Sequence, residues 1–153
     1  MDGDPPRERS RRTGLGIRGL DHIQLAMPRG EEALARLFYA GLLGLTEVSK
    51  PKELRSRGGC WFIGQGVAIH LGAVRHFRAA TRAHPAFVVG DLDQARRSLE
   101  SAGMTIEEDD SGLPLRRFYV ADPFGNRIEI VDAADGGFTM RRARRTRDSR
   151  DGR

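Results

Sequence analysis

The stretch that decides the fold is Arg117–Asp132, which reads RFYVADPFGNRIEIVD. It begins with the β-prone run FYV, breaks at the turn-forming residues DPFGN, and resumes as IEIV. This pattern predicts a β-hairpin with a wide loop. Glu129 stands between Ile128 and Ile130, so in a strand its side chain points away from both isoleucines. Taken alone, Glu129 fits polar alternation on a solvated face, but on an enclosed face its carboxylate needs a cation or a donor.

Length and charge describe one folded domain with basic ends. The chain has 153 residues, enough for one domain with its own core. Residues 1–18 and 136–153 lack apolar periodicity and carry 5 and 7 of the 26 basic residues. The centre, residues 19–135, holds 14 basic and 16 acidic residues. The high isoelectric point therefore belongs to the ends, which we interpret as disordered tails (1–16 and 136–153). An Arg-rich tail that contacts phosphates is the alternative, and a nucleic-acid partner is not expected of the domain itself.

Cysteine usage and hydropathy point to the cytoplasm. Cys60 is the only cysteine, so the chain has no internal disulfide. The first residues lack the apolar region of a secretory signal, and no run has the length of a membrane span. We therefore expect a cytoplasmic protein without a membrane partner.

The first half of the chain predicts five elements. A strand at 19–27 carries His22 on the face opposite its aliphatic residues. A helix at 31–43 follows, with strands at 45–48, 60–63 and 67–71, and His70 alternates between aliphatic neighbours in the last of them. The helix is expected to bury one stripe of side chains, made of Leu34, Leu37, Phe38, Tyr39 and Leu42.

The second half repeats this order. A strand opens at His84, a helix at 91–102 begins at the N-cap Asp91, a strand follows at 104–106, and the hairpin ends the series with Glu129. His84 lies 62 residues after His22, and Glu129 lies 59 residues after His70. Each half is thus a βαβββ module, residues 17–72 and 83–135, within one domain at 17–135. Hairpins outnumber crossovers, so we expect an α+β fold: two modules forming a curled, mostly antiparallel mixed sheet with helices outside.

Four chemically active residues occupy equivalent places in the two modules, and each alternates away from its aliphatic neighbours. If the curled sheet encloses a concave face, all four could line it. Three imidazoles and one carboxylate are the donors of a divalent-metal site. Singly, each strand histidine is more simply a hydrogen-bonded surface residue, and His76, in the connector, is interpreted that way. The candidate ligands are His22, His70, His84 and Glu129.

Five features of the sequence occur together in one known family, and the last is the most specific: DHI at 21–23, FY at 38–39 with LGL at 43–45, VAIHL at 67–71, His84, and DPFGNRIE at 122–129. On these features the sequence resembles the vicinal oxygen chelate superfamily, which includes glyoxalases, bleomycin resistance proteins and extradiol dioxygenases. The resemblance covers about residues 17–133.

The resemblance implies paired βαβββ modules around a metal-binding cup, with a divalent ion (Fe, Mn, Co, Ni or Zn) held by the four candidate ligands. The extradiol branch implies a smaller set, His22, His84 and Glu129, with ferrous iron. It also implies a homodimer, in which modules pair within or between chains. The expected function is a metal-dependent lyase, isomerase or dioxygenase acting on a small substrate with neighbouring oxygens. The alternative is a binding protein that sequesters an antibiotic or another small ligand.

Roles follow for the individual residues. His70 and Glu129 are the candidate catalytic residues, although bacterial glyoxalase I usually has glutamate in the place of His70. Arg57 and Arg117 are candidates for binding a substrate carboxylate, and surface arginines otherwise. Trp61 and Phe124 are candidates for the pocket wall, with core or loop packing as the alternative.

Overall fold

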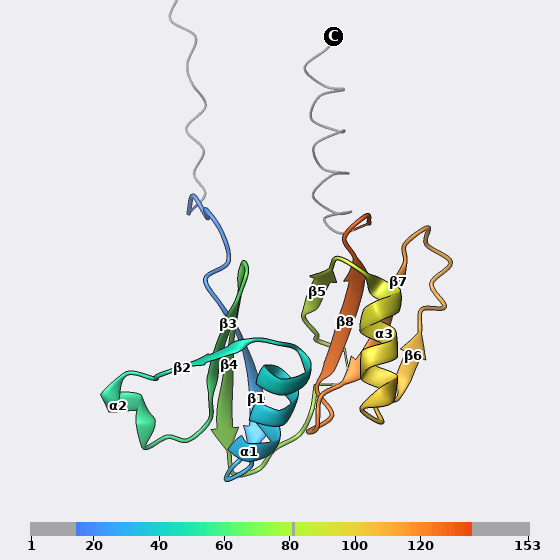
Figure 1. Cartoon of the computed structure of the whole chain (residues 1–153). Helices are drawn as coiled ribbons and strands as arrows, with labels where there is room; N and C mark the ends of the chain where they lie inside the picture. The colour runs from blue at the N-terminus through green and yellow to red at the C-terminus, as the bar shows by residue number, and fades with distance from the viewer. Residues whose placement is uncertain (1–14, 81, 136–153) are drawn as a thin grey trace, which may run out of the picture.

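The structure is a computed structural model that describes residues 15–80 and 82–135. The two predicted tails fall outside these residues, apart from positions 15 and 16. Within the described part of the chain, no helix has the length and apolar character needed to cross a bilayer. Figure 1 shows the chain divided into two groups of strands, each with a helix beside it.

The first module forms a four-stranded sheet in the order β1-β4-β3-β2. β1 pairs with β4 in parallel, and the other two pairings are antiparallel. One helical segment follows β1, and a second, short helix lies between β2 and β3. The elements are β1 (Ile23–Pro28), α1 (Glu32–Ala35), η1 (Arg36–Leu42), β2 (Thr46–Val48), α2 (Lys52–Arg55), β3 (Trp61–Gly64) and β4 (Val67–Val74).

The second module repeats the arrangement, with strand order β5-β8-β7-β6. Its β5–β8 pairing is parallel and its two hairpin pairings are antiparallel. The side chain of Asp91 accepts a hydrogen bond from the amide of Gln94 at 2.8 Å, which caps the helix as expected. The elements are β5 (Ala86–Val89), α3 (Leu92–Ser101), β6 (Ile106–Glu108), β7 (Arg117–Ala121) and β8 (Arg127–Asp132).

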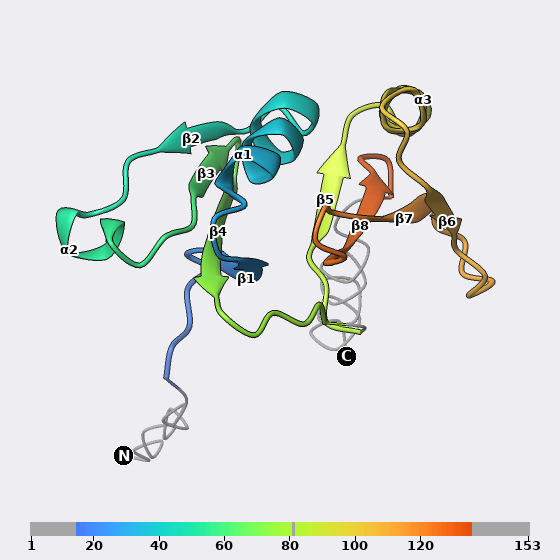
Figure 2. The ribbon, with the colours of Figure 1, turned by 90° about the horizontal axis from the view of Figure 1, so that it is seen from below.

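The predicted fold class is confirmed: two βαβββ modules build an α+β fold of mostly antiparallel strands. The strands divide into two four-stranded sheets, and no ladder joins these sheets among the described residues. In Figure 2, α1 and α3 both lie along the upper side of the molecule. The residues under the helices are the aliphatic ones, such as Ile69 and Ile128, both with 0% exposure.

The prediction for the first helix is wrong in part. Phe38 and Tyr39 are buried, but Leu34 and Leu37 are 43% and 70% exposed. Leu37 lies in η1, a π-helix in which Leu43 donates to the carbonyl of Phe38, five residues back, at 2.8 Å. The wider turn breaks the 3.6-residue period on which the predicted stripe rests, so two consecutive aromatics face the core. Leu34 lies in α1, before the π-helix begins, and both leucines line an open apolar cavity.

One buried polar cluster joins the modules. The Tyr39 hydroxyl donates to Asp122 at 2.8 Å, and Nδ2 of Asn126 donates to the Ala26 carbonyl at 2.8 Å. Asp122 also accepts hydrogen bonds from the amides of Phe124 and Asn126. The β7–β8 loop, residues 122–126, is thereby tied to η1 and β1 of the other module. We call Tyr39, Asp122 and Asn126 the junction cluster.

Candidate functional site

The face of each sheet that lies away from its helix carries the chemically active residues. In the first sheet, Trp61 lies opposite His70, and Gln24 lies opposite it on the other side. In the second sheet, Tyr119 lies opposite Glu129. Because side chains alternate along a strand, these residues share the face opposite the buried Ile69 and Ile128. We call these two surfaces the helix-free faces.

In the first module, three rings stack on the helix-free face. His70 lies between Trp61, at a centroid distance of 3.8 Å and an angle of 5°, and His22, at 4.0 Å and 23°. Two predicted ligands and one predicted wall residue therefore form one stack, with His70 at its centre. The stack holds the His70 ring on both faces and leaves its edge as the part that can bind a ligand.

The electrostatics of this stack favour neutral imidazole at His70. Burial lowers the pKa of His70, the neighbouring His22 lowers it further, and Asp21 partly opposes the shift. Nδ1 of His22 lies 2.6 Å from Asp21 Oδ2, so the ring that donates there keeps its Nε2 lone pair free. Both histidines thus have the chemistry of metal ligands, since a metal binds unprotonated nitrogen.

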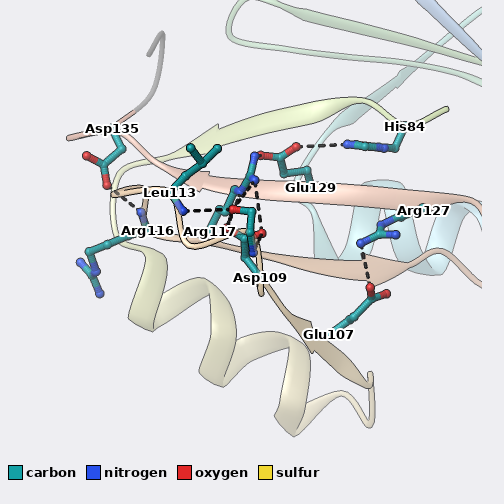
Figure 3. Close-up of polar contacts among 10 residues, drawn as sticks. His84, Glu107, Asp109, Leu113, Arg116, Arg117, Arg127, Glu129 and Asp135 are labelled. Atoms are coloured by element: carbon teal, nitrogen blue, oxygen red, sulfur yellow. Dashed lines mark hydrogen bonds and ion pairs between the residues drawn. The ribbon is translucent and has the colours of Figure 1, made fainter. Parts of the chain in front are cut away.

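In the second module, Glu129 is held from two sides (Figure 3). His84 Nε2 lies 3.1 Å from Glu129 Oε2, and Arg117 Nη1 donates to Glu129 Oε1 at 2.9 Å. The Glu129 side chain is only 10% exposed. Nδ1 of His84 lies 2.7 Å from the carbonyl oxygen of Arg82, which can only accept, so this nitrogen carries the proton and Nε2 is directed at the carboxylate.

Arg117 is fully engaged by protein groups. Its Nε and Nη2 donate to Asp109 at 2.9 and 3.2 Å, and Nη2 also donates to Ser111 at 3.1 Å. The hydrogen bonds from Arg117 lower the pKa of Asp109 to about 2. The same contacts, led by the bond to Asp109, raise the pKa of Arg117. Its charge is therefore directed at Asp109 and Glu129, and little of it is left for a ligand.

The donor set fits a divalent metal, but in two halves. Two ligands about 2.1 Å from one ion and about 100° apart lie roughly 3.2 Å from each other, and His84 Nε2 and Glu129 Oε2 are 3.1 Å apart. His22, which directly precedes β1, and His70 in β4 form the other half, in the other module. In residues 15–80 and 82–135, no three His, Cys, Asp or Glu side chains come together in a group that could hold a metal.

The other predicted site residues lie apart from these halves. Arg57 is exposed in the turn after α2. Phe124 lies in the β7–β8 loop, packs against the core and meets Phe77 edge to face at 6.3 Å. A cavity of about 350 Å³ lies between the modules, lined by Gln24, His84 and Asn126 among others.

Two residues on the second helix-free face were not among the predictions. Tyr119 and Arg127 lie beside Glu129, and the Arg127 guanidinium lies 3.9 Å from the Tyr119 ring centroid. The sequence motif DPFGNRIE at 122–129 could have indicated Arg127, because this residue stands two positions before Glu129 in a strand and must share its face.

Comparison with known proteins gives the relationships of the chain. A family model described as Glyoxalase/Bleomycin resistance protein/Dioxygenase superfamily matches residues 19–130. No curated protein matches the sequence. A putative glyoxalase family protein from Bacillus anthracis has a similar structure, with a TM-score of 0.72 and 46% identity over 76% of this chain and 95% of that one.

Two further solved structures are similar. A glyoxalase/dioxygenase from Nostoc punctiforme has a TM-score of 0.63 at 26% identity, over 76% of this chain and 92% of that one. The genomically encoded fosfomycin resistance protein FosX from Listeria monocytogenes has a TM-score of 0.62 at 18% identity, over 75% and 91%, which shows a common fold alone. With the motif, the repeated module and the matching family model in agreement, this chain belongs to the Glyoxalase/Bleomycin resistance protein/Dioxygenase superfamily.

Proposed function

We propose that this protein is a divalent-metal-dependent enzyme, of lyase, isomerase or dioxygenase type, that acts on a small substrate with neighbouring oxygens. The ligands are His22, His70, His84 and Glu129. The observation that carries the proposal is that these four residues form two contacting pairs on the helix-free faces, at equivalent places of the repeat. Solvated polar alternation does not require this pairing, whereas a shared ion does.

The residues of the proposed site have separate roles in the reaction. A bound divalent ion would polarise two adjacent substrate oxygens and stabilise the negative charge that develops on them. Arg117 holds the Glu129 carboxylate in one orientation through Oε1, which leaves Oε2 and the neighbouring His84 Nε2 for the ion. His70, whose lowered pKa favours the neutral ring, is suited to accept a proton from the substrate when it is not bound to metal. Trp61 covers one face of that ring and keeps water from it.

The complete site is proposed to form between two chains. One chain offers the His22–His70 pair in its first module and the His84–Glu129 pair in its second, without a group of three ligands in the described residues. In a homodimer related by a two-fold axis, the first pair of one chain meets the second pair of its partner, and the symmetry produces two equal sites.

Metal content tests the proposal first. Protein purified without a histidine tag is expected to bind about one divalent ion per chain, and His22→Ala together with Glu129→Ala should abolish this binding. The matched control is His76→Ala, which removes a histidine that is not proposed as a ligand. Absence of a stoichiometric ion, or unchanged binding in the double variant, would contradict the proposal.

Mixed dimers test where the site forms. Chains with His70→Ala and chains with Glu129→Ala carry different tags, and the mixed dimer is isolated by both. If sites are shared between chains, one site of the mixed dimer has no substitution, and about half of the metal binding returns. If sites form within one chain, neither site is intact and the mixed dimer stays empty.

A binding protein without turnover is the second candidate. The cavity of about 350 Å³ between the modules has the size of a small-molecule site and favours this candidate. The same metal measurement separates the two functions, because a sequestering protein of this kind needs no ion with open coordination positions.

A further inference from the structure

Arg127 and Tyr119 form a platform beside Glu129 on the second helix-free face. Arg127 precedes Glu129 by two residues in β8, so their α-carbons are about 6–7 Å apart and their side chains share a face. The guanidinium lies over the Tyr119 ring, with its central carbon 3.9 Å from the ring centroid. The ring supports the guanidinium plane and leaves the edges of that plane, with their N–H groups, as the binding surface.

Arg127 has donors that the described protein residues do not use. Nη2 donates to Glu107 at 2.7 Å, and Figure 3 shows the two side chains directed at each other. Nε is buried and has no hydrogen-bond partner in the described part of the chain. Because Nε is enclosed by protein atoms, a ligand would meet the guanidinium at its Nη edge, beside the bond to Glu107. The Arg127 side chain is 31% exposed, which leaves it within reach of a ligand.

The platform borders a cavity of about 370 Å³. Thr105, Glu107, Tyr119 and Arg127 line it, and the connector residues Ala79 and Ala80 close one side. The cavity therefore combines the Arg127–Glu107 ion pair, a hydroxyl and an aromatic ring with small apolar residues. The Glu107 side chain is 63% exposed, so its carboxylate can turn to solvent when another anion binds Arg127. This lining suits a compact ligand that has one acidic group.

We propose that Arg127, on its Tyr119 platform, binds the acidic group of the substrate, a carboxylate or a phosphate-like anion. The inference rests on the proposed function, and it narrows the substrate class to anions. In such a substrate the neighbouring oxygens reach the ion held by Glu129, and the acidic group lies far enough from them to reach Arg127 at the same time. Arg127 replaces Arg117 as the anion-binding residue, because Arg117 already makes four hydrogen bonds to Asp109, Ser111 and Glu129.

Arg96 supplies a matched control. Like Arg127, it pairs with a glutamate, Glu108, and its guanidinium lies over an aromatic ring, that of Phe118, at 4.8 Å. It belongs to α3, on the opposite side of the same sheet. Arg127→Gln and Arg96→Gln remove the same charge, and both keep the Arg-rich ends of the chain, so phosphate binding by those ends cancels in the comparison.

The first experiment uses metal-free protein and inorganic phosphate. Phosphate, compared with chloride at equal ionic strength, is expected to raise the melting temperature of the original protein and of Arg96→Gln, but not of Arg127→Gln. Arg127→Lys keeps the charge without the fork and should weaken the response; it carries the test if Arg127→Gln does not fold. An equal response in the Arg127 variants, or an equal loss in Arg96→Gln, would overturn the assignment.

The second experiment uses metal-loaded protein and three chelating probes. Catechol has two neighbouring oxygens, 3,4-dihydroxybenzoate adds a carboxylate across the ring, and 2,3-dihydroxybenzoate places it beside the chelating oxygens. We expect 3,4-dihydroxybenzoate to bind about tenfold more tightly than catechol, an advantage that Arg127→Gln removes. Equal gains for both acids would overturn the proposal. If the original protein binds no metal but still responds to phosphate through Arg127, the proposed enzyme is refuted and the anion site is retained.

Discussion

Among single residues, the central feature is the charged chain Asp109–Arg117–Glu129, which ends beside His84. Its carboxylates are each about nine-tenths buried, and Arg117 separates them with donors directed at both. Without Arg117, two carboxylates would lie close together in a poorly solvated place, where like charges repel. The arginine thus fixes the orientation of Glu129 and makes the burial of its charge tolerable.

Arg117→Gln should therefore destabilise the protein strongly. Removing one partner of a buried ion pair costs about 3–5 kcal/mol, and since Arg117 is 15% exposed we expect a loss of about 3 kcal/mol. The control Arg96→Gln breaks a pair in which Glu108 is 69% exposed and well solvated, so the free energy of unfolding should change much less. Urea unfolding of metal-free protein measures both. Equal losses in the two variants would show that the charged chain has no special energetic role.

The same ion pair predicts how stability depends on acid. Hydrogen bonds from Arg117 lower the pKa of Asp109 from its ordinary value of 3.8 to about 2. Because the folded value lies below the unfolded one, the pair stabilises the protein fully above about pH 4, and this contribution is lost as the pH falls through about 2. Stability measured between pH 5 and 2 should fall more steeply for the original protein than for Asp109→Asn. Parallel curves would contradict the shift.

At the scale of elements, the entry to β3 depends on one glycine. Gly59 has a φ of +82°, and a Cβ there would lie 2.0 Å from the carbonyl oxygen of Leu71 in the neighbouring strand. Its amide also donates to the Glu32 carboxylate at 2.8 Å, which ties β3 to the first helix. The close approach brings Trp61 into position to stack on His70, so local backbone geometry supports the first half of the site.

Gly59→Ala should cost about 3 kcal/mol or more, because strain at positive φ adds to a backbone clash that the sheet cannot relieve. Gly66 also has a positive φ, +72°, but nothing lies within 4 Å of its Cβ position. A substitution there therefore measures the cost of positive φ without a clash. Gly66→Ala should cost about 1 kcal/mol. Thermal unfolding compares the pair, and similar losses in both variants would refute the predicted contact with Leu71.

The elements also show what the sequence could predict. Period-two alternation placed Glu129 and His70 opposite their aliphatic neighbours, and the repeat predicted two βαβββ modules, because both signals are local. The burial of Leu37 was predicted wrongly, since the hydrophobic pattern does not reveal a π-helix, and that of Leu34 was predicted wrongly because the pattern does not show that this residue lines an open cavity. Asp109 was missed as the partner of Arg117 because it lies in a loop with no periodicity, and loop paths depend on tertiary contacts.

At the scale of the whole molecule, the repeat predicts equivalent positions but not the distances between modules. Nothing in the alternation says how far the His22–His70 pair lies from the His84–Glu129 pair. Their separation depends on the junction cluster, which joins residues 83 positions apart for Tyr39 and Asp122, and 100 positions apart for Asn126 and Ala26. The same cluster should decide whether the modules unfold together.

Asn126→Ala should lower the stability of both modules equally. It removes donors to Ala26 and Asp122 in a buried place, at a cost of about 1–3 kcal/mol. Because one continuous core contains Phe62 of the first module and Phe118 of the second, neither sheet should survive the loss of the other. Native-state hydrogen exchange measures this. The amides of β4 and β8 are expected to share one opening free energy in the original protein, and to share one lower value in Asn126→Ala. If exchange became faster in β8 alone, the modules would be separate folding units, and the geometry of the site would have to be set by the pairing of chains rather than by the junction cluster.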